Sequence, residues 1–145
     1  MIEIEVNQKV GKVKPKDFWV KLVKIIVREL NLKKSGHVSL AIVGQKEMRK
    51  LNFTYRGINA ATNVLSFPEA EVKQKIDRLD ENYLGEVVLC WSYIKNQATE
   101  QKVEFDLMLI WFFIHGVLHL LGYQHDSQKQ LMIMESLEHK ILAKI

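Results

Sequence analysis

The sequence is poor in the residues that mark several classes of protein. Its 145 residues include one cysteine, two prolines and seven glycines. The single cysteine, Cys90, cannot form a disulfide within the chain, which excludes a disulfide-stapled scaffold and favours a reducing, cytoplasmic location. The chain also has no internal repeat and no Gly/Ser-rich linker. We therefore expect one domain over residues 1–145.

A targeting signal and a long apolar run are missing as well. The chain opens with alternating acidic and apolar residues, not with the basic and then apolar order of a signal peptide. Its most apolar stretch, residues 107–123, is shorter than the roughly 20 apolar residues that a membrane span needs, and it contains two histidines. These features predict a buried core helix and no membrane partner.

The positive charge is unevenly distributed. Residues 1–36 hold nine basic and four acidic residues, so their net charge is +5, whereas the whole chain has a net charge of +4. A concentrated basic surface favours anionic partners, including nucleic acid. A solvated helix face explains the same charges equally well.

Periodicity in the sequence predicts the main elements. Apolar and polar residues alternate, or apolar residues run together, over 2–6, 37–43, 63–67 and 83–90, which predicts four strands. Helical spacing predicts five helices, at 15–31, 45–55, 92–102, 104–121 and 127–143. The densely charged segment 69–81 predicts a mobile loop or a frayed helix. This order predicts an α+β fold, a small mixed sheet of about four strands with about five helices packed on it.

The most informative stretch of the sequence contains three histidines. His115 and His119 are four residues apart on a predicted helix, so they project from the same face, one turn apart. Gly122 stands where the helix should end, and a glycine there reverses the chain at low cost. The reversal can bring His125 back to the other two. A lone histidine in an apolar helix is usually a hydrogen-bonded core residue, but three in this arrangement predict a metal site.

Three neutral imidazoles leave one position open on a tetrahedral ion, which is typical of a catalytic zinc site. Zinc, one ion per chain, is the first choice, although nickel, copper and iron also accept imidazole. The histidine spacing is that of metzincin proteases, which carry a glutamate general base directly after the first histidine. The residue here is Gly116, which cannot move a proton. Peptide hydrolysis by that route is therefore disfavoured.

Phosphodiester cleavage is compatible with these residues. Its transition state gains negative charge, and a fixed guanidinium can stabilise that charge. The candidate is Arg56, at a predicted helix end, although its position alone favours a surface arginine. We expect Thr62, Asn63 and Ser66 to form turn structure first and a wall of the site second.

Other residues that often carry chemistry have simpler explanations here. Cys90 lies in an apolar strand and is expected to be a buried structural thiol. His37 and His139 are expected at the surface. The three tryptophans fit core packing better than base stacking: Trp19, Trp91 and Trp111.

Two motifs resemble those of a known family. HGVLHLLGYQHD, from His115, is similar to the YbeY endoribonuclease signature HGxLHLxGYDH, and LNFTYRGINAATNVLSFP, from Leu51, is similar to the family's LNxxYRxxxxxTxVLSFP. The segments YLGEVVLC and MESLEHKIL and the length of the chain also match. The resemblance covers essentially the whole chain, and the two motifs are specific in their order and spacing.

The resemblance implies a zincin-like α+β fold and a single-strand-specific, metal-dependent endoribonuclease. Such an enzyme acts in ribosomal RNA maturation, at the 3′ end of the small-subunit RNA, and in ribosome quality control. It would be cytoplasmic, with single-stranded or ribosomal RNA and the ribosome or its proteins as partners. His115, His119 and His125 would bind the zinc. Arg56 and His115 would be the catalytic residues.

The sequence departs from the family pattern at one position and leaves other questions open. Gln124 replaces the usual aspartate before the third histidine, so a charge that could orient a ligand is missing. Either an activated water or the RNA 2′-hydroxyl could attack the phosphate. Two alternative functions stay open: a zinc-dependent hydrolase of peptides or small esters, and a ribosome assembly factor with little catalysis of its own.

Overall fold

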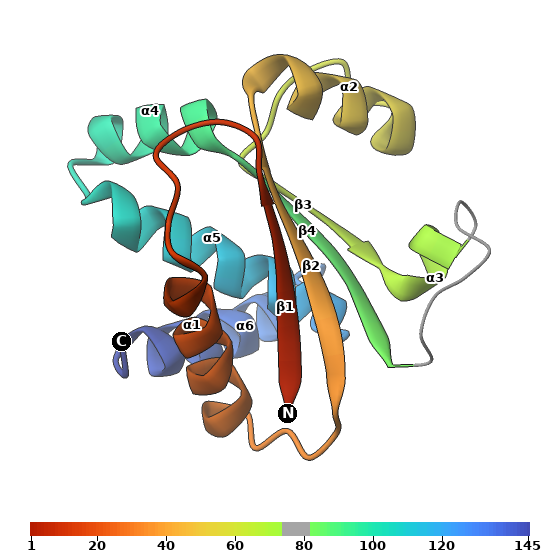
Figure 1. Cartoon of the computed structure of the whole chain (residues 1–145), viewed down its shortest axis with the longest axis vertical. Helices are drawn as coiled ribbons and strands as arrows, with labels where there is room; N and C mark the ends of the chain where they lie inside the picture. Colours follow the sequence, from red (N-terminus) through yellow and green to blue (C-terminus); the bar gives the residue numbers. More distant parts are fainter. Residues whose placement is uncertain (74–81) are drawn as a thin grey trace.

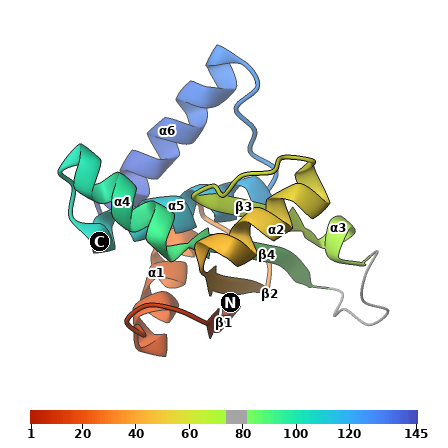
Figure 2. The same ribbon diagram turned by 90° about the horizontal axis from the view of Figure 1, so that it is seen from above.

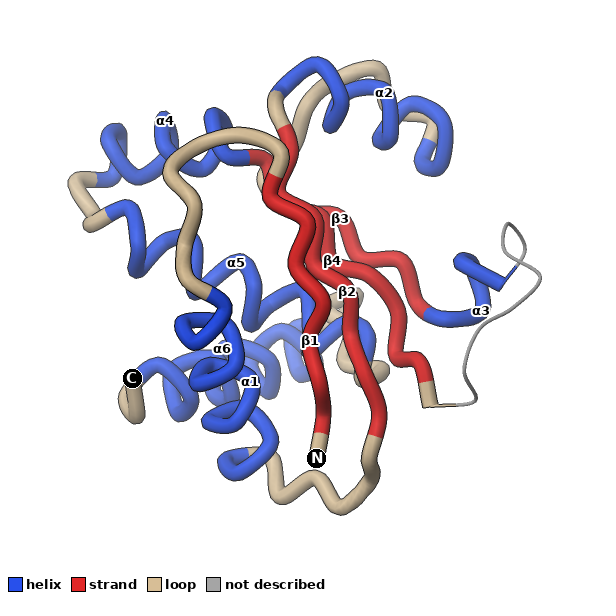
Figure 3. The backbone as a smooth tube through the Cα atoms, in the orientation of Figure 1, coloured by secondary structure: helices blue, strands red, loops and turns tan. Residues whose placement is uncertain are grey.

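The structure, a computed structural model, describes residues 1–73 and 82–145 (Figure 3). It contains a four-stranded sheet in the order β1-β2-β4-β3. The strands are β1 (Ile2–Gln8), β2 (Gly36–Val43), β3 (Val64–Pro68) and β4 (Tyr83–Cys90). Strands β1, β2 and β4 are parallel to one another, whereas β3 is antiparallel to β4. The predicted α+β fold with a small mixed sheet is confirmed.

Six helices are present in the described part of the chain, one more than the sequence predicted. They are α1 (Lys16–Glu29), α2 (Gln45–Arg56), α3 (Glu69–Lys73), α4 (Trp91–Gln101), α5 (Phe105–Leu120) and α6 (Gln128–Leu142). The additional helix, α3, is a single short turn at the start of the segment for which a loop or a frayed helix was expected. The rest of that segment, residues 74–81, lies outside the described residues.

The larger core lies on one face of the sheet. Helices α1, α5 and α6 lie on this side, and α2 and α3 lie on the other (Figure 1). Alternation in β1 turns Ile2 and Ile4 toward the larger core while Glu3 and Glu5 stay exposed. Trp19 of α1 and Phe113 of α5 are fully buried in this core, with their ring centroids 5.2 Å apart. Aromatic side chains of this size supply much of the hydrophobic stabilisation of a core.

Helix α5 is apolar on most of its surface because it is covered by the sheet, by α4 and by α6. In the described residues no single helix is long and apolar enough to cross a membrane. Helices α4 and α5 pass that test only as a pair, and they are bent by 120° at the break between them.

The smaller core lies on the opposite face, where α2 covers the sheet through Met48. This packing fixes the direction of α2 and so places Arg56, its last residue, near the end of β3. Figure 2 shows α2 beside β3 and α6 projecting away from the rest of the chain. Helix α6 begins with a capping box between Ser127 and Gln130. Helix α4 begins at Trp91, one residue before the predicted start at residue 92, and Cys90 precedes it.

Candidate metal centre

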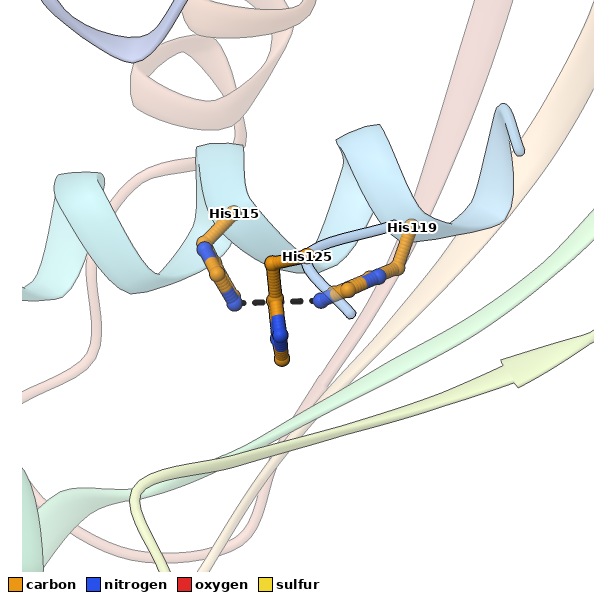
Figure 4. A group of neighbouring side chains, drawn as sticks. All are labelled: His115, His119 and His125. Atoms are coloured by element: carbon orange, nitrogen blue, oxygen red, sulfur yellow. Dashed lines mark hydrogen bonds between the residues drawn. The ribbon is translucent and has the colours of Figure 1, made fainter. Parts of the chain in front are cut away.

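Three histidines converge at the C-terminal end of α5. His115 and His119 extend from one face of the helix, and His125 returns from the segment that follows it (Figure 4). One ring nitrogen of each histidine lies within 4.8 Å of the others. The group could hold a metal ion. The clustering that the sequence predicted for these three residues is therefore present.

Gly122 makes the return of His125 sterically easy. Its φ is +99°, a conformation that residues with a Cβ rarely adopt. Backbone amides close the end of the helix: Gly122 N–H donates to His119 O at 3.0 Å, and Tyr123 N–H donates to Leu118 O at 3.0 Å. The reversal of the chain that was predicted at this glycine is confirmed.

A buried carboxylate orients His115. Glu138 of α6 is 4% exposed, and its Oε1 lies 2.7 Å from His115 Nδ1. The other oxygen, Oε2, accepts a hydrogen bond of 2.6 Å from Trp111 Nε1. An ionised carboxylate can only accept hydrogen bonds, so the proton of the His115 ring is on Nδ1. The lone pair of His115 is then on Nε2, which faces the centre of the cluster.

A backbone carbonyl orients His119 in the same way. Its Nδ1 lies 2.9 Å from Tyr123 O, which can only accept, so Nδ1 carries the proton and Nε2 carries the lone pair. The Nε2 atoms of His115 and His119 are 3.1 Å apart, the contact drawn in Figure 4. Two imidazole nitrogens bound to one tetrahedral zinc at about 2.0–2.1 Å would be roughly 3.3–3.4 Å apart. Two lone pairs held this close are stabilised by a cation between them, so the residues fit a bound metal.

The electrostatic environment keeps the donors in the forms that a metal requires. Burial lowers the pKa of His119, and the neighbouring His115 lowers it further. Burial by itself would raise the pKa of Glu138, but the hydrogen bonds from His115 and Trp111 outweigh it, so this pKa lies below its usual range. At neutral pH the ring of His119 is therefore uncharged and Glu138 is ionised.

Arg56 lies in the same cleft as the histidines. The cleft has a volume of about 550 Å³ and is lined by Arg56, Ser66 and Glu71 in addition to the three histidines. The guanidinium of Arg56 donates to both oxygens of Glu71, at 2.9 and 3.1 Å, and to Ser66 O at 2.9 Å. It also lies 4.9 Å from the centroid of the Phe67 ring. These contacts hold the guanidinium at the edge of the cleft.

Gly116 allows α5 to approach the sheet closely. A Cβ at this position would lie 2.7 Å from Val87 Cγ1 and 3.2 Å from Ser66 Oγ. Ser66 Oγ donates to Gly116 O at 3.1 Å, so β3 is tied to α5 at this point. Any side chain at this position would require α5 or β4 to shift. The close packing therefore disfavours a glutamate here, in addition to its absence from the sequence.

Asn63 has the role expected of it, whereas Ser66 does not form turn structure. Asn63 Oδ1 accepts from Val64 N–H at 2.8 Å, as in a turn, and its Nδ2 donates to Gln97 Oε1 at 3.3 Å. Ser66 instead lies within β3, and its hydroxyl donates to the main chain of α5. Asn63 and Ser66 line the cleft, as does Gln124, which is exposed.

Several other expectations are confirmed, and one needs correction. Cys90 and Trp19 are fully buried, and His139 is exposed. Trp111 packs against the larger core as expected, and its Nε1 also donates to Glu138. His37, expected at the surface, is half-buried, with its ring 4.8 Å from the ring of Tyr83.

The chain matches the family model described as Endoribonuclease YbeY over residues 2–145. Two relatives named Endoribonuclease YbeY are each 35% identical to it. The relative from Buchnera aphidicola subsp. Acyrthosiphon pisum aligns over 144 residues, 98% of this chain and 88% of its own, and that from Pseudomonas putida over 149 residues, 100% and 90%. This chain belongs to the YbeY family. The resemblance in the two motifs is thereby confirmed.

The fold has a counterpart among solved structures. The solution structure of TM1509 from Thermotoga maritima matches this YbeY-family chain with a TM-score of 0.62 and 24% sequence identity. The match covers 99% of this chain and 91% of that protein. At this level of identity the match is evidence for a shared fold, and this evidence extends over nearly the whole chain.

Sequence reasoning missed two carboxylates of the site. Glu138 and Glu71 lie on helices remote in sequence from the residues they contact. Glu138 lies in the segment MESLEHKIL, which was matched to the family without a role for this residue. Glu138 could have been noticed as a charged residue on a stripe of α6 that also carries Met134 and Ile141, both buried. Glu71 lies in a densely charged segment and gave no such signal.

Proposed function

We propose that this YbeY-family protein is a zinc-dependent endoribonuclease that cleaves single-stranded RNA in ribosomal RNA maturation. The observation that carries the proposal is the convergence of His115, His119 and His125 beside Arg56 in one cleft. A metal site next to a fixed guanidinium suits a reaction at a phosphodiester. The family name of the relatives, endoribonuclease, supports the same reaction.

Zinc, one ion per chain, fits the donor set best. The donors are three imidazoles, and such sites commonly keep a fourth, open position for catalysis. A zinc ion bound there would polarise a phosphoryl oxygen and make a coordinated water more acidic. His115 and His119 contribute by presenting Nε2 lone pairs already oriented by Glu138 and Tyr123. Loss of His115 would remove both a ligand and this orientation.

Arg56 is proposed as the second catalytic residue. Its guanidinium would bind a non-bridging phosphate oxygen and stabilise the charge that develops during cleavage. Glu71 now occupies the two donors that a phosphate would use. Substrate binding therefore exchanges one anion for another at the guanidinium, and a partly exposed ion pair of this kind costs little to break.

Two groups could attack the phosphate that Arg56 binds, the RNA 2′-hydroxyl or a water molecule. Attack by the RNA 2′-hydroxyl gives a 2′,3′-cyclic phosphate, whereas direct attack by water leaves a 5′-phosphate or a 3′-phosphate without that cyclic form. Mass spectrometry of the first products separates the two. Either chemistry is consistent with the roles given to the three histidines and Arg56.

We also propose where the protein acts and which partners it has. The single domain of residues 1–145 would act in the cytoplasm, on ribosomal RNA at the 3′ end of the small-subunit RNA and in ribosome quality control. The ribosome or its proteins would present the RNA. Exposed basic residues of α1, Lys21, Lys24 and Arg28, offer a surface for an anionic partner. Some basic residues of this quarter are paired: Lys9 with Glu47, Lys14 with Asp106, and Arg28 with its neighbour Glu29.

The experiment is cleavage of labelled single-stranded and double-stranded RNA by the purified chain. We expect cleavage of the single strand only, loss of cleavage on chelation, and recovery on adding zinc. His119→Ala should stay inactive after zinc is added, and Glu100→Gln, an exposed change on α4, should behave as wild type. Cleavage that persists with chelator or in His119→Ala would overturn the metal-dependent mechanism. Digestion of a peptide library in place of RNA would favour the alternative hydrolase.

A further inference from the structure

A second cavity lies behind the metal centre. It has a volume of about 280 Å³ and is enclosed by α4, α5 and α6. Its floor is apolar and aromatic, with Met108, Trp111 and Phe112 of α5 and Met134 of α6. Its rim carries Gln101 and Glu135, both exposed, so the cavity opens to the surface between α4 and α6.

This cavity adjoins the catalytic cleft. His115 lines both of them, and Arg56 lines the cleft whereas Trp111 lines the cavity. Asn63 Nδ2, in the wall of the cleft, donates to Gln97 Oε1, in the wall of the cavity, at 3.3 Å. Because the two share the side chain of His115, a group bound in the cavity lies next to a group bound at the metal centre.

The cleft and the cavity differ in chemistry. The cleft offers the guanidinium of Arg56, which suits a phosphate. The cavity is lined by aromatic and thioether side chains, by the amides of Gln97 and Gln101, and by the carboxylates of Glu135 and Glu138. A carboxylate only accepts hydrogen bonds and repels phosphate, whereas it can accept from the N–H groups of a base. Amides donate and accept, as the edges of bases do.

We propose that this cavity is a subsite for one nucleobase of the RNA, adjacent to the phosphate that is cleaved. The inference rests on the proposed endoribonuclease function and adds to it the part of the substrate that the protein recognises. The cavity is smaller than the roughly 300–1,000 Å³ of sites that enclose a whole drug-sized ligand. A flat aromatic base fits this size, and burying it on an aromatic floor stabilises the complex. Only an unpaired base can enter, which explains a preference for single-stranded RNA.

The test measures binding of a single-stranded RNA that contains the fluorescent base 2-aminopurine. The protein is used without metal, in chelator, so that binding is read without cleavage. We expect a saturable change in 2-aminopurine emission and a Kd that rises about tenfold in Phe112→Ala, the size of effect seen when a stacking aromatic is removed. The double variant Gln97→Ala/Gln101→Ala should raise the Kd several-fold. Asn96→Ala and Glu100→Gln, exposed changes on the same helix α4, should leave the Kd unchanged.

The dependence of binding on salt separates a base subsite from a phosphate site. Loss of a base contact weakens binding at every salt concentration and leaves the slope of log Kd against log salt unchanged, whereas loss of a phosphate contact lowers the slope. We therefore expect an unchanged slope in the cavity variants and a reduced slope in Arg56→Ala. A cavity variant that binds as wild type, or that changes the slope, overturns the subsite. Because these readings need no cleavage, they stay informative if the proposed activity itself fails.

Discussion

His115 and Glu138 are separated by 23 residues in the sequence, yet their side chains meet at 2.7 Å in the structure. The contact links α5, which carries two of the three histidines, to α6, and it fixes which nitrogen of His115 is available to a metal. It also places a carboxylate with a lowered pKa next to a site for a cation. The C-terminal helix is thus part of the metal centre although it contributes no ligand.

Replacing Glu138 with glutamine should weaken metal binding. The amide keeps the shape of the side chain but loses the charge, and changes of this kind beside a ligand typically cost about 10- to 100-fold in metal affinity. Competition with a chromophoric chelator measures the zinc affinity, and thermal unfolding in chelator shows whether the variant is folded. Glu135→Gln, an exposed change on the same helix, serves as the control. Equal zinc affinity in Glu138→Gln and wild type would contradict the role of this carboxylate.

Replacing Glu71 with glutamine should improve the use of RNA. The carboxylate competes with substrate phosphate for the guanidinium of Arg56, and an exposed ion pair is worth up to about 1 kcal/mol, or about fivefold. We expect the KM for RNA to fall by up to that factor while kcat changes little. Arg56→Ala should lose cleavage but retain zinc. A raised KM in Glu71→Gln would instead show that the carboxylate positions the guanidinium productively.

Replacing Gly116 with alanine should destabilise the protein. The new methyl group would lie 2.7 Å from Val87 Cγ1, so α5 or β4 must shift, and overpacking of this kind costs about 1–3 kcal/mol. Urea unfolding measures the loss in the free energy of unfolding. Gly57→Ala is an unsuitable control because that glycine has a positive φ. Ala98→Gly, which removes a methyl group from a buried position of α4 instead of adding one, is measured for comparison. Wild-type stability in Gly116→Ala would show that the helix is free to move away from the sheet.

The stability of the metal-free protein should depend on the protonation of His119. Its pKa is lowered in the folded state, so the unfolded chain binds more protons as the pH falls below about 6.5. The free energy of unfolding should therefore decrease from pH 7.5 to pH 5.5, and by less in His119→Gln, which cannot take up this proton. Urea unfolding in chelator at the two pH values gives the difference. A loss of stability that is equal in both proteins would contradict the lowered pKa.

The α+β architecture could be predicted from the sequence because its signals are local. Alternation in Ile2–Gln8 and the helical spacing of Trp19, Leu22 and Ile26 each depend on which residues meet the core. The three histidines could be found because two share a helix face and a glycine marks the turn before the third. The order of the strands, β1-β2-β4-β3, could not be predicted from the sequence, because no local pattern specifies which strands pair.

The partners of the site could not be predicted for the same physical reason. The contact of His115 with Glu138 depends on how α6 packs on α5, and the contact of Arg56 with Glu71 depends on where β3 ends. Arg56 itself could be singled out, but its position in the sequence alone favoured a surface residue, whereas the structure has Arg56 in the wall of the cleft. Charged residues that lie far apart in the sequence reveal their pairing only in the folded chain.

The most direct test of the central claim is a zinc titration in which bound metal and RNA cleavage are measured on the same metal-free sample. Inductively coupled plasma mass spectrometry after gel filtration gives zinc per chain, and labelled single-stranded RNA gives the rate. Cleavage should rise in proportion to bound zinc and level off at one zinc per chain. Binding of one zinc with no gain in cleavage, or cleavage that is complete before zinc is added, would contradict a catalytic metal held by His115, His119 and His125.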